Sequence, residues 1–159
     1  MEHKLVTFFS ASGITAKLAN ELSEAIGADL FEIEPAVRYS AADLDWQDQA
    51  SRSTIEMKNA ASRPAIARKR ENMNEYDIIF VGFPIWWYKA PTIINTFLEA
   101  YDFSGKTIVP FATSGGSDMG KTNEWLAPSC PGAKLVEGKV LRGTYTREMM
   151  DSWVKSLNL

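Results

Sequence analysis

The chain has 159 residues, a length that suits one domain with a full hydrophobic core. Hydrophobic residues make up 45% and charged residues 23%, which is ordinary for a folded globular protein. The formal net charge of −3 argues against nucleic acid as a partner, and no apolar run approaches the ~20 residues of a membrane helix. We therefore expect a single soluble domain over residues 1–159, with no nucleic-acid or membrane partner.

Strand and helix patterns alternate along the chain. Five apolar stretches are expected to be strands: Lys4–Phe9, Asp29–Glu34, Asp77–Phe83, Thr107–Thr113 and Lys134–Leu141. Helical spacing of apolar residues predicts four helices: Thr15–Ile26, Pro91–Tyr101, Gly120–Leu126 and Thr146–Leu157, the last with Thr146 as its N-cap. The third and fourth strands are almost continuously apolar, as in a parallel sheet that is buried on both faces. The alternation predicts a doubly wound α/β fold.

The stretch Pro35–Glu75 interrupts this alternation and is mostly polar. Asp43–Asn59 is polar, with Trp46 as its main apolar anchor, and Arg63-Pro64 is incompatible with a helix that continues through it. We expect a long excursion with one or two helical pieces, anchored by Trp46. Its basic run Arg63–Arg70, which includes Arg68-Lys69-Arg70, is typical of a solvated helix face, or could attract a phosphate of NADPH or a redox partner.

The single cysteine and the first residues indicate a compartment. Cys130 has no second cysteine in the chain with which to form a disulfide, which is compatible with a reducing environment. Met1–Lys4 run directly into an apolar strand without the longer apolar region of a secretion signal. We expect a cytoplasmic protein.

An opening loop, Ser10-Ala11-Ser12-Gly13-Ile14-Thr15, joins the first strand to the first helix. A helix N-terminus offers unpaired backbone N–H groups and the positive end of the helix dipole, which suit a phosphate. Gly13 lets the backbone wrap closely around a ligand, and the three hydroxyls add hydrogen-bond donors. The same residues also suit an ordinary helix cap, in which Ser12 or Thr15 satisfies the first turn.

Two more loops follow the third and fourth strands. The middle loop, Pro84-Ile85-Trp86-Trp87-Tyr88, carries three successive aromatic side chains, which indicate either a platform for a flat ring or a hydrophobic lid over the core. The third loop, Thr113-Ser114-Gly115-Gly116-Ser117, is small and flexible enough for its N–H groups to approach a ligand. In a parallel sheet all three loops would lie at the carboxyl ends of the strands, where ligands bind.

Together, the three loops resemble those of the flavodoxin family, in the family's order and over essentially the whole chain. The resemblance implies a flavodoxin-like three-layer sandwich around a five-stranded parallel sheet of order 2-1-3-4-5, with FMN as cofactor. The residues implied to bind FMN are Ser10, Ser12, Gly13, Ile14, Thr15 and Ala16 around the phosphate, and Pro84, Ile85, Trp86, Trp87, Tyr88, Thr113, Ser114, Gly115, Gly116 and Ser117 around the ring. It implies no catalytic side chain and no metal.

The chain departs from the family pattern at two places. Ile14 stands where many flavodoxins have Asn, so one side-chain hydrogen bond to the phosphate is absent. Many one-electron flavodoxins also have a glycine beside the flavin, where a peptide flip stabilises the one-electron-reduced ring, whereas Ile85–Tyr88 contains none. A flip to positive φ there would cost on the order of 1–3 kcal/mol, so we expect the one-electron-reduced ring to be weakly stabilised and two-electron transfer to be favoured.

Three functions remain open. The resemblance implies an electron-transfer protein that docks on redox partner proteins, and the departures leave room for an NAD(P)H-dependent oxidoreductase with a quinone-like acceptor. A remote alternative is a nucleotide-binding P-loop, because Gly115–Thr122 matches G-x-x-x-x-G-K-S/T. However, Asp77–Val81 does not end in the Asp that holds Mg²⁺ in such proteins.

Overall fold

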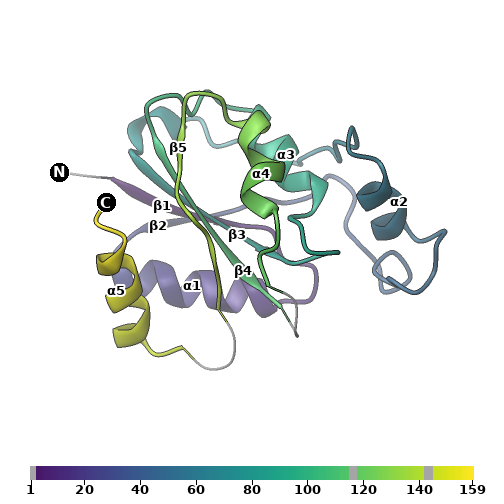
Figure 1. Cartoon of the computed structure of the whole chain (residues 1–159), viewed down its shortest axis with the longest axis horizontal. Helices are drawn as coiled ribbons and strands as arrows, with labels where there is room; N and C mark the ends of the chain where they lie inside the picture. The colour runs from purple at the N-terminus through teal and green to yellow at the C-terminus, as the bar shows by residue number, and fades with distance from the viewer. Residues whose placement is uncertain (1–2, 115–117, 142–144) are drawn as a thin grey trace.

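A parallel β-sheet runs through the middle of the molecule in the computed structural model, which describes residues 3–114, 118–141 and 145–159 (Figure 1). Its strands are β1 (Lys4–Phe8), β2 (Asp29–Glu32), β3 (Ile78–Pro84), β4 (Thr107–Thr113), β5 (Lys134–Leu135) and β6 (Lys139–Val140). The order is β2-β1-β3-β4-β5, every pairing is parallel, and β6 also pairs with β4. The predicted fold class and strand order are confirmed.

The fifth position of the sheet is shared by two short strands, whereas we predicted one strand over residues 134–141. The cause lies in β4, because Pro110 has no backbone N–H with which to continue the ladder. The carbonyl of Val136 instead accepts a hydrogen bond of 2.9 Å from the side-chain amide of Asn123. Pairing resumes where the Leu141 N–H donates to the carbonyl of Ala112 at 2.8 Å. One proline therefore splits the strand.

Helices cover both faces of the sheet. Helices α1 (Ile14–Ile26) and α5 (Arg147–Ser156) pack on one face, and α3 (Thr92–Glu99) and α4 (Thr122–Leu126) on the other (Figure 1). Thr146 caps α5 as predicted, since its hydroxyl accepts the Met149 N–H at 3.1 Å. Within the described residues, no helix combines the length and the apolar character that crossing a bilayer requires.

Alternate residues of the central strands feed two separate cores. On the α1 and α5 face, Phe80 of β3 packs edge-to-face on Trp153, with ring centres 6.1 Å apart. On the opposite face, Ile79 and Val81 pack with residues of α3 such as Phe97. Because successive side chains of a strand point to opposite faces, a strand buried on both sides is apolar at nearly every position.

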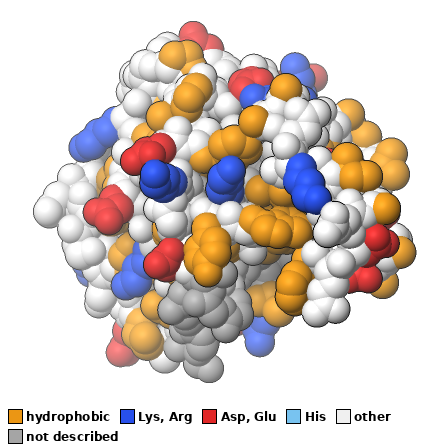
Figure 2. Space-filling model, turned by 45° about the vertical axis from the view of Figure 1, so that its right-hand side comes forward, with side chains coloured by type: hydrophobic (Ala, Val, Ile, Leu, Met, Phe, Trp, Pro, Cys, Tyr) orange, Lys and Arg blue, Asp and Glu red, His pale blue; other side chains and the backbone are white. Residues whose placement is uncertain are grey.

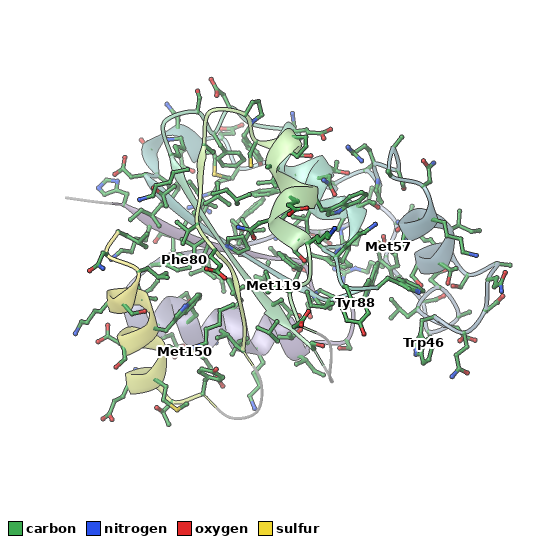
Figure 3. The ribbon with its side chains drawn as sticks, in the orientation of Figure 1. Trp46, Met57, Phe80, Tyr88, Met119 and Met150 are labelled. Atoms are coloured by element: carbon green, nitrogen blue, oxygen red, sulfur yellow. The ribbon has the colours of Figure 1, made fainter. Side chains whose placement is uncertain are left out.

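The excursion between β2 and β3 extends from the side of the molecule toward which β1 and β3 run, at the right of Figure 1. It contains α2 (Arg52–Lys58), and a short 3-10 helix (Met73–Glu75) precedes β3. Met57 of α2 is buried, whereas Trp46 is 67% exposed and stands at the outer end of the excursion (Figure 3). The expectation that Trp46 anchors the excursion is therefore wrong.

Candidate functional site

The three loops meet at Thr113, the last residue of β4. Its hydroxyl lies 2.7 Å from the hydroxyl of Thr15, which is 98 residues away in the sequence, and both side chains are buried. Its carbonyl accepts the N–H of Ile85 in the middle loop at 2.9 Å. Thr15 is therefore not a helix cap but a link to the third loop. One residue thus joins the opening, middle and third loops at the carboxyl edge of the sheet.

The opening loop presents an uncapped helix N-terminus. Gly13 is the N-cap residue of α1, with φ 93°, and no side chain of the described residues caps the helix. The Gly13 N–H donates to the Ser10 hydroxyl at 3.0 Å, which closes the loop. A Cβ on Gly13 would meet no atom within 4 Å, so the loop faces open space, and Ser12 is exposed. The first-turn N–H groups of Ile14, which is exposed, and of Ala16, which is half-buried, follow directly.

The middle loop is a tight two-residue turn with unusual backbone angles. The N–H of Trp86 donates to the carbonyl of Lys89 at 3.0 Å, and the N–H of Lys89 returns to the carbonyl of Trp86 at 3.1 Å. The residues between them, Trp87 and Tyr88, have φ 50° and 62°, the type I′ pattern that glycine or asparagine normally supplies. Both residues therefore already have the positive φ that the sequence analysis treats as strained. For bulky side chains this conformation costs on the order of 1–3 kcal/mol per residue.

The segment before α4 holds this turn in place. The Thr122 hydroxyl donates to the carbonyl of Met119 and, at 3.4 Å, to that of Tyr88. Gly120, with φ 52°, lies so close that a Cβ there would come within 2.8 Å of the Tyr88 carbonyl oxygen. In Figure 3, Met119 and Tyr88 lie in the same region of the molecule although they come from different loops. The contacts of Gly120 and Thr122 with Tyr88 therefore offset the backbone strain of the turn.

The three aromatic side chains of the middle loop are divided between two roles. Trp86 is half-buried and packs edge-to-face on Phe9 and Tyr39, with ring centres 5.7 Å and 5.6 Å away. Trp87 and Tyr88 are 42% and 59% exposed. Figure 2 turns this side of the molecule forward, and hydrophobic side chains gather near the middle of the view, with Lys and Arg side chains around them. Trp86 thus folds down on the core, while Trp87 and Tyr88 stay available to a ligand.

Comparisons with known proteins settle the family. The family profile described as flavodoxin matches residues 3–157. The chain belongs to the flavodoxin family. A solved structure of a candidate flavoprotein from Bacteroides eggerthii is 45% identical, covers 100% of this chain and 99% of its own, and has a TM-score of 0.94. Another, from Bacteroides uniformis, is 48% identical, covers 97% and 98%, and has a TM-score of 0.91.

A more distant flavodoxin-like structure was solved with a ligand. It is a flavoprotein from Lactobacillus acidophilus in complex with FMN, 24% identical over 100% of both chains, with a TM-score of 0.71. At that identity the likeness shows the fold alone. A search of curated proteins found no match.

In this flavodoxin, the segment that formally matches a P-loop has a structural use. Gly115, Gly116 and Ser117 lie outside the described residues, and Ser114 is half-buried. The Thr122 hydroxyl, which would contact Mg²⁺ in a P-loop, is bonded to main-chain carbonyls. Among the described residues, no group of three His, Cys, Asp or Glu side chains could hold a metal. These contacts weigh against the nucleotide-binding alternative.

Two other candidates from the sequence, the basic run and Cys130, are explained by structural contacts or burial in this flavodoxin. The expectation that the run Arg63–Arg70 forms a helix face is wrong, because none of its residues is helical. Arg68 pairs with Glu34 at 3.6 Å, and the Arg70 guanidinium donates to the Tyr76 hydroxyl at 2.8 Å. Burial raises the pKa of the Cys130 thiol and keeps it protonated, which does not suit a nucleophile.

Sequence reasoning missed the residues that hold the turn. Gly120 and Thr122 were noted only as parts of a predicted helix and of a nucleotide motif, and Tyr39 was not singled out at all. Tyr39 and Trp46 are both aromatic residues in a polar stretch, and no local pattern tells which of them faces inward. An alternation of apolar and polar residues would have been such a signal, but the excursion has none.

Proposed function

We propose that this flavodoxin binds FMN non-covalently at the carboxyl edge of its sheet and acts in electron transfer. The junction at Thr113 carries the proposal, because it joins an uncapped helix N-terminus to an exposed aromatic turn. A phosphate and a flat ring are the two ends of FMN, and these are the two features that such ends require. The Lactobacillus relative that was solved with FMN supports the choice of ligand.

The opening loop would hold the phosphate. The first-turn N–H groups of Ile14, Thr15 and Ala16 point out of the N-terminus of a 13-residue helix, where the helix dipole favours negative charge. Ser12 is exposed beside them and can donate its hydroxyl. No lysine is needed, because backbone amides and the dipole suffice for a dianion.

The middle loop would flank the ring with Trp87 and Tyr88. When bound, FMN supplies the redox chemistry, since its ring takes up and releases electrons. The two exposed side chains would cover one side of the ring and keep water away from it. The Thr15–Thr113 contact then fixes the distance between the phosphate seat and the ring seat.

The turn itself favours transfer of electrons in pairs. Flipping the peptide between Trp87 and Tyr88 would convert the type I′ turn into type II′, whose first central residue combines positive φ with ψ of about −120°. That region is essentially restricted to glycine, so the Trp87 side chain blocks the flip. This observation favours the second candidate, an NAD(P)H-dependent oxidoreductase with a quinone-like acceptor, beside a carrier that docks on redox partner proteins.

Ligand binding tests the first part of the proposal. We expect the purified protein, or the flavin-free protein after addition of FMN, to give the structured visible spectrum of a bound flavin. We expect riboflavin, which lacks the phosphate, to bind at least about 100-fold more weakly, since two or more charge-assisted hydrogen bonds are lost. A colourless protein that binds neither ligand would overturn the proposal.

A pair of variants tests the electron count. In anaerobic redox titrations of the FMN-loaded protein, Trp87→Gly should reveal separate uptake of a first electron, because glycine permits the flip. Trp87→Ala removes the same indole without that freedom, so it should behave like the wild type. Equal behaviour of the two variants would contradict a role for backbone freedom. Rapid reduction by NADPH or NADH alone would select the oxidoreductase over the carrier.

A further inference from the structure

The Tyr39 side chain of the excursion reaches the proposed flavin site. Its ring lies 5.5 Å from that of Phe9 and 5.6 Å from that of Trp86, at interplanar angles of 61° and 69°. Phe9 and Trp86 also contact each other, at 5.7 Å and 89°. We call these three residues the carboxyl-edge cluster. It brings together the end of β1, the excursion and the middle loop through edge-to-face contacts, the geometry that aromatic pairs prefer.

Helix α2 also holds Tyr39 in place. The Arg52 guanidinium lies 3.8 Å from the centre of the Tyr39 ring, close enough for a cation–π contact. Arg52 also donates to the Glu56 carboxylate at 2.9 Å and to the Val37 carbonyl at 2.6 Å. The Tyr39 hydroxyl donates to the same carboxylate. Burial, and then the bond to Glu56, raise the pKa of Tyr39, so the hydroxyl keeps its proton and continues to donate.

The residue that Tyr39 contacts closes the strained turn. Trp86 contributes both its N–H and its carbonyl to the two hydrogen bonds that frame Trp87 and Tyr88. Contacts from Gly120 and Thr122 hold the turn at Tyr88, whereas the carboxyl-edge cluster holds it at Trp86. The turn is thus held from both sides, and the excursion supplies one of them.

We infer that Tyr39 is a positioning residue, which holds Trp86 and thereby keeps the Trp87–Tyr88 turn in the arrangement that receives the flavin ring. The inference rests on the proposed function, because it takes this turn as the ring-binding part of the site. It gives the excursion a role that neither the family pattern nor the Thr113 junction supplies. A site that is ordered before the ligand arrives loses less conformational freedom on binding, and so binds more tightly.

Three variants test this role, and the chain offers a matched control. Tyr39→Leu removes the ring contacts and the hydroxyl, whereas Tyr39→Phe keeps the ring contacts and removes only the hydroxyl. The control is Tyr101→Leu: the Tyr101 ring also has two aromatic neighbours, Phe97 and Phe103, at 5.4 Å and 5.7 Å. Its hydroxyl also has one hydrogen bond, accepted from the Arg70 N–H at 2.8 Å.

The first readout is hydrogen exchange of the Trp86 and Lys89 amides in the flavin-free protein, because both amides are bonded across the turn. We expect Tyr39→Leu to accelerate their exchange at least about tenfold, and Tyr39→Phe by no more than about threefold. The second readout is the Kd for FMN, which should rise at least about tenfold in Tyr39→Leu only. Tyr101→Leu should change the two readouts by no more than its overall loss of stability accounts for.

Unchanged exchange at Trp86 and Lys89 in a folded Tyr39→Leu protein would overturn the inference. So would an equal loss of FMN affinity in Tyr101→Leu, since the effect would then reflect general stability. If the wild type binds no FMN but Tyr39→Leu still frees the turn, the proposed function fails while Tyr39 still positions the turn. Should Tyr39→Leu not fold, Arg52→Gln removes the cation over the ring and should accelerate the same amides about threefold; no acceleration would overturn the inference.

Discussion

Two clusters of three aromatic rings lie in different parts of the molecule and have nearly the same spacing between ring centres. In the carboxyl-edge cluster the ring centres are 5.5–5.7 Å apart. In the second, made of Phe97, Tyr101 and Phe103 at the end of α3 and before β4, they are 5.4–5.7 Å apart. We call the second the amino-edge cluster, because it lies where β4 begins.

What differs is the backbone to which each cluster is attached. The amino-edge cluster is joined to a regular helix and strand, and its residues have ordinary φ angles. The carboxyl-edge cluster is joined to a turn with two bulky residues at positive φ and with exposed aromatic side chains. Aromatic packing by itself therefore does not mark a site. The marker is strained backbone that the surrounding contacts hold in place.

The largest expected effect is a difference in stability loss between two glycine substitutions, one at each edge of the sheet. Gly120 has φ 52° and touches Tyr88, whereas Gly105, before β4, has φ 78° with no atom within 4 Å of a Cβ built on it. Gly120→Ala should lower the free energy of unfolding by about 3 kcal/mol, and Gly105→Ala by about 1 kcal/mol, since only the first adds a clash to the strain. Urea unfolding measures both losses.

The same pair tests whether the edges differ in function. Gly120→Ala should also weaken FMN binding, because its Cβ pushes on the carbonyl of Tyr88. Gly105→Ala should leave the Kd for FMN unchanged. Similar losses of stability and of affinity in both variants would remove the distinction between the two edges.

A smaller effect is expected at the hydroxyl pair Thr15–Thr113. Each single change to Val leaves the other buried hydroxyl without its partner, which should cost about 1–2 kcal/mol of stability. The double variant should lose about as much as either single variant, so the coupling free energy should also be about 1–2 kcal/mol in size. Unfolding of all four proteins measures it. Simple additivity would mean that the two hydroxyls do not act together.

The smallest expected effect is a pH dependence that belongs to the amino edge. Hydrogen bonds from Arg63, at 2.9 Å and 3.0 Å, and from the Ser129 hydroxyl hold the pKa of Glu99 below its usual range. A lowered folded-state pKa contributes stability above the unfolded-state value, and this is lost as the pH falls through the folded-state value.

The Tm of the wild type should therefore decline between about pH 5 and pH 3, and the decline should be shallower in Arg63→Gln. FMN affinity measured at neutral pH should be the same in both proteins, since Glu99 lies away from the carboxyl edge. A parallel decline of the two Tm curves would show that this ion pair does not contribute.

Most of the fold is predictable because burial determines which positions of a strand or helix are apolar, and this pattern can be recognised in the sequence. Continuous apolar runs marked β3 and β4, and the hydroxyl of Thr146 marked the start of α5. The division of the fifth strand was not predictable from its own residues. It depends on a proline in the neighbouring strand, and which carbonyl meets that proline is known only once the strands are paired.

The site is only partly predictable, for a related reason. The opening loop, the middle loop and Thr113 could be assigned to one edge because parallel strands end together. The positive φ of Trp87 and Tyr88 could not be predicted, because the local preference of both residues opposes it. The contacts that compensate for it come from Gly120 and Thr122, in another part of the chain. Trp46 was mistaken for the anchor of the excursion because composition does not tell which aromatic residue faces inward.

Amide NMR spectra of the ¹⁵N-labelled, flavin-free protein, recorded while FMN is added, test the carboxyl-edge site most directly. The largest shifts are predicted for the amides of Gly13–Thr15 and of Trp87 and Tyr88, with none at Tyr101 and Phe103. Shifts centred on the amino-edge cluster, or no shifts at all, would contradict a flavin site built on the strained turn.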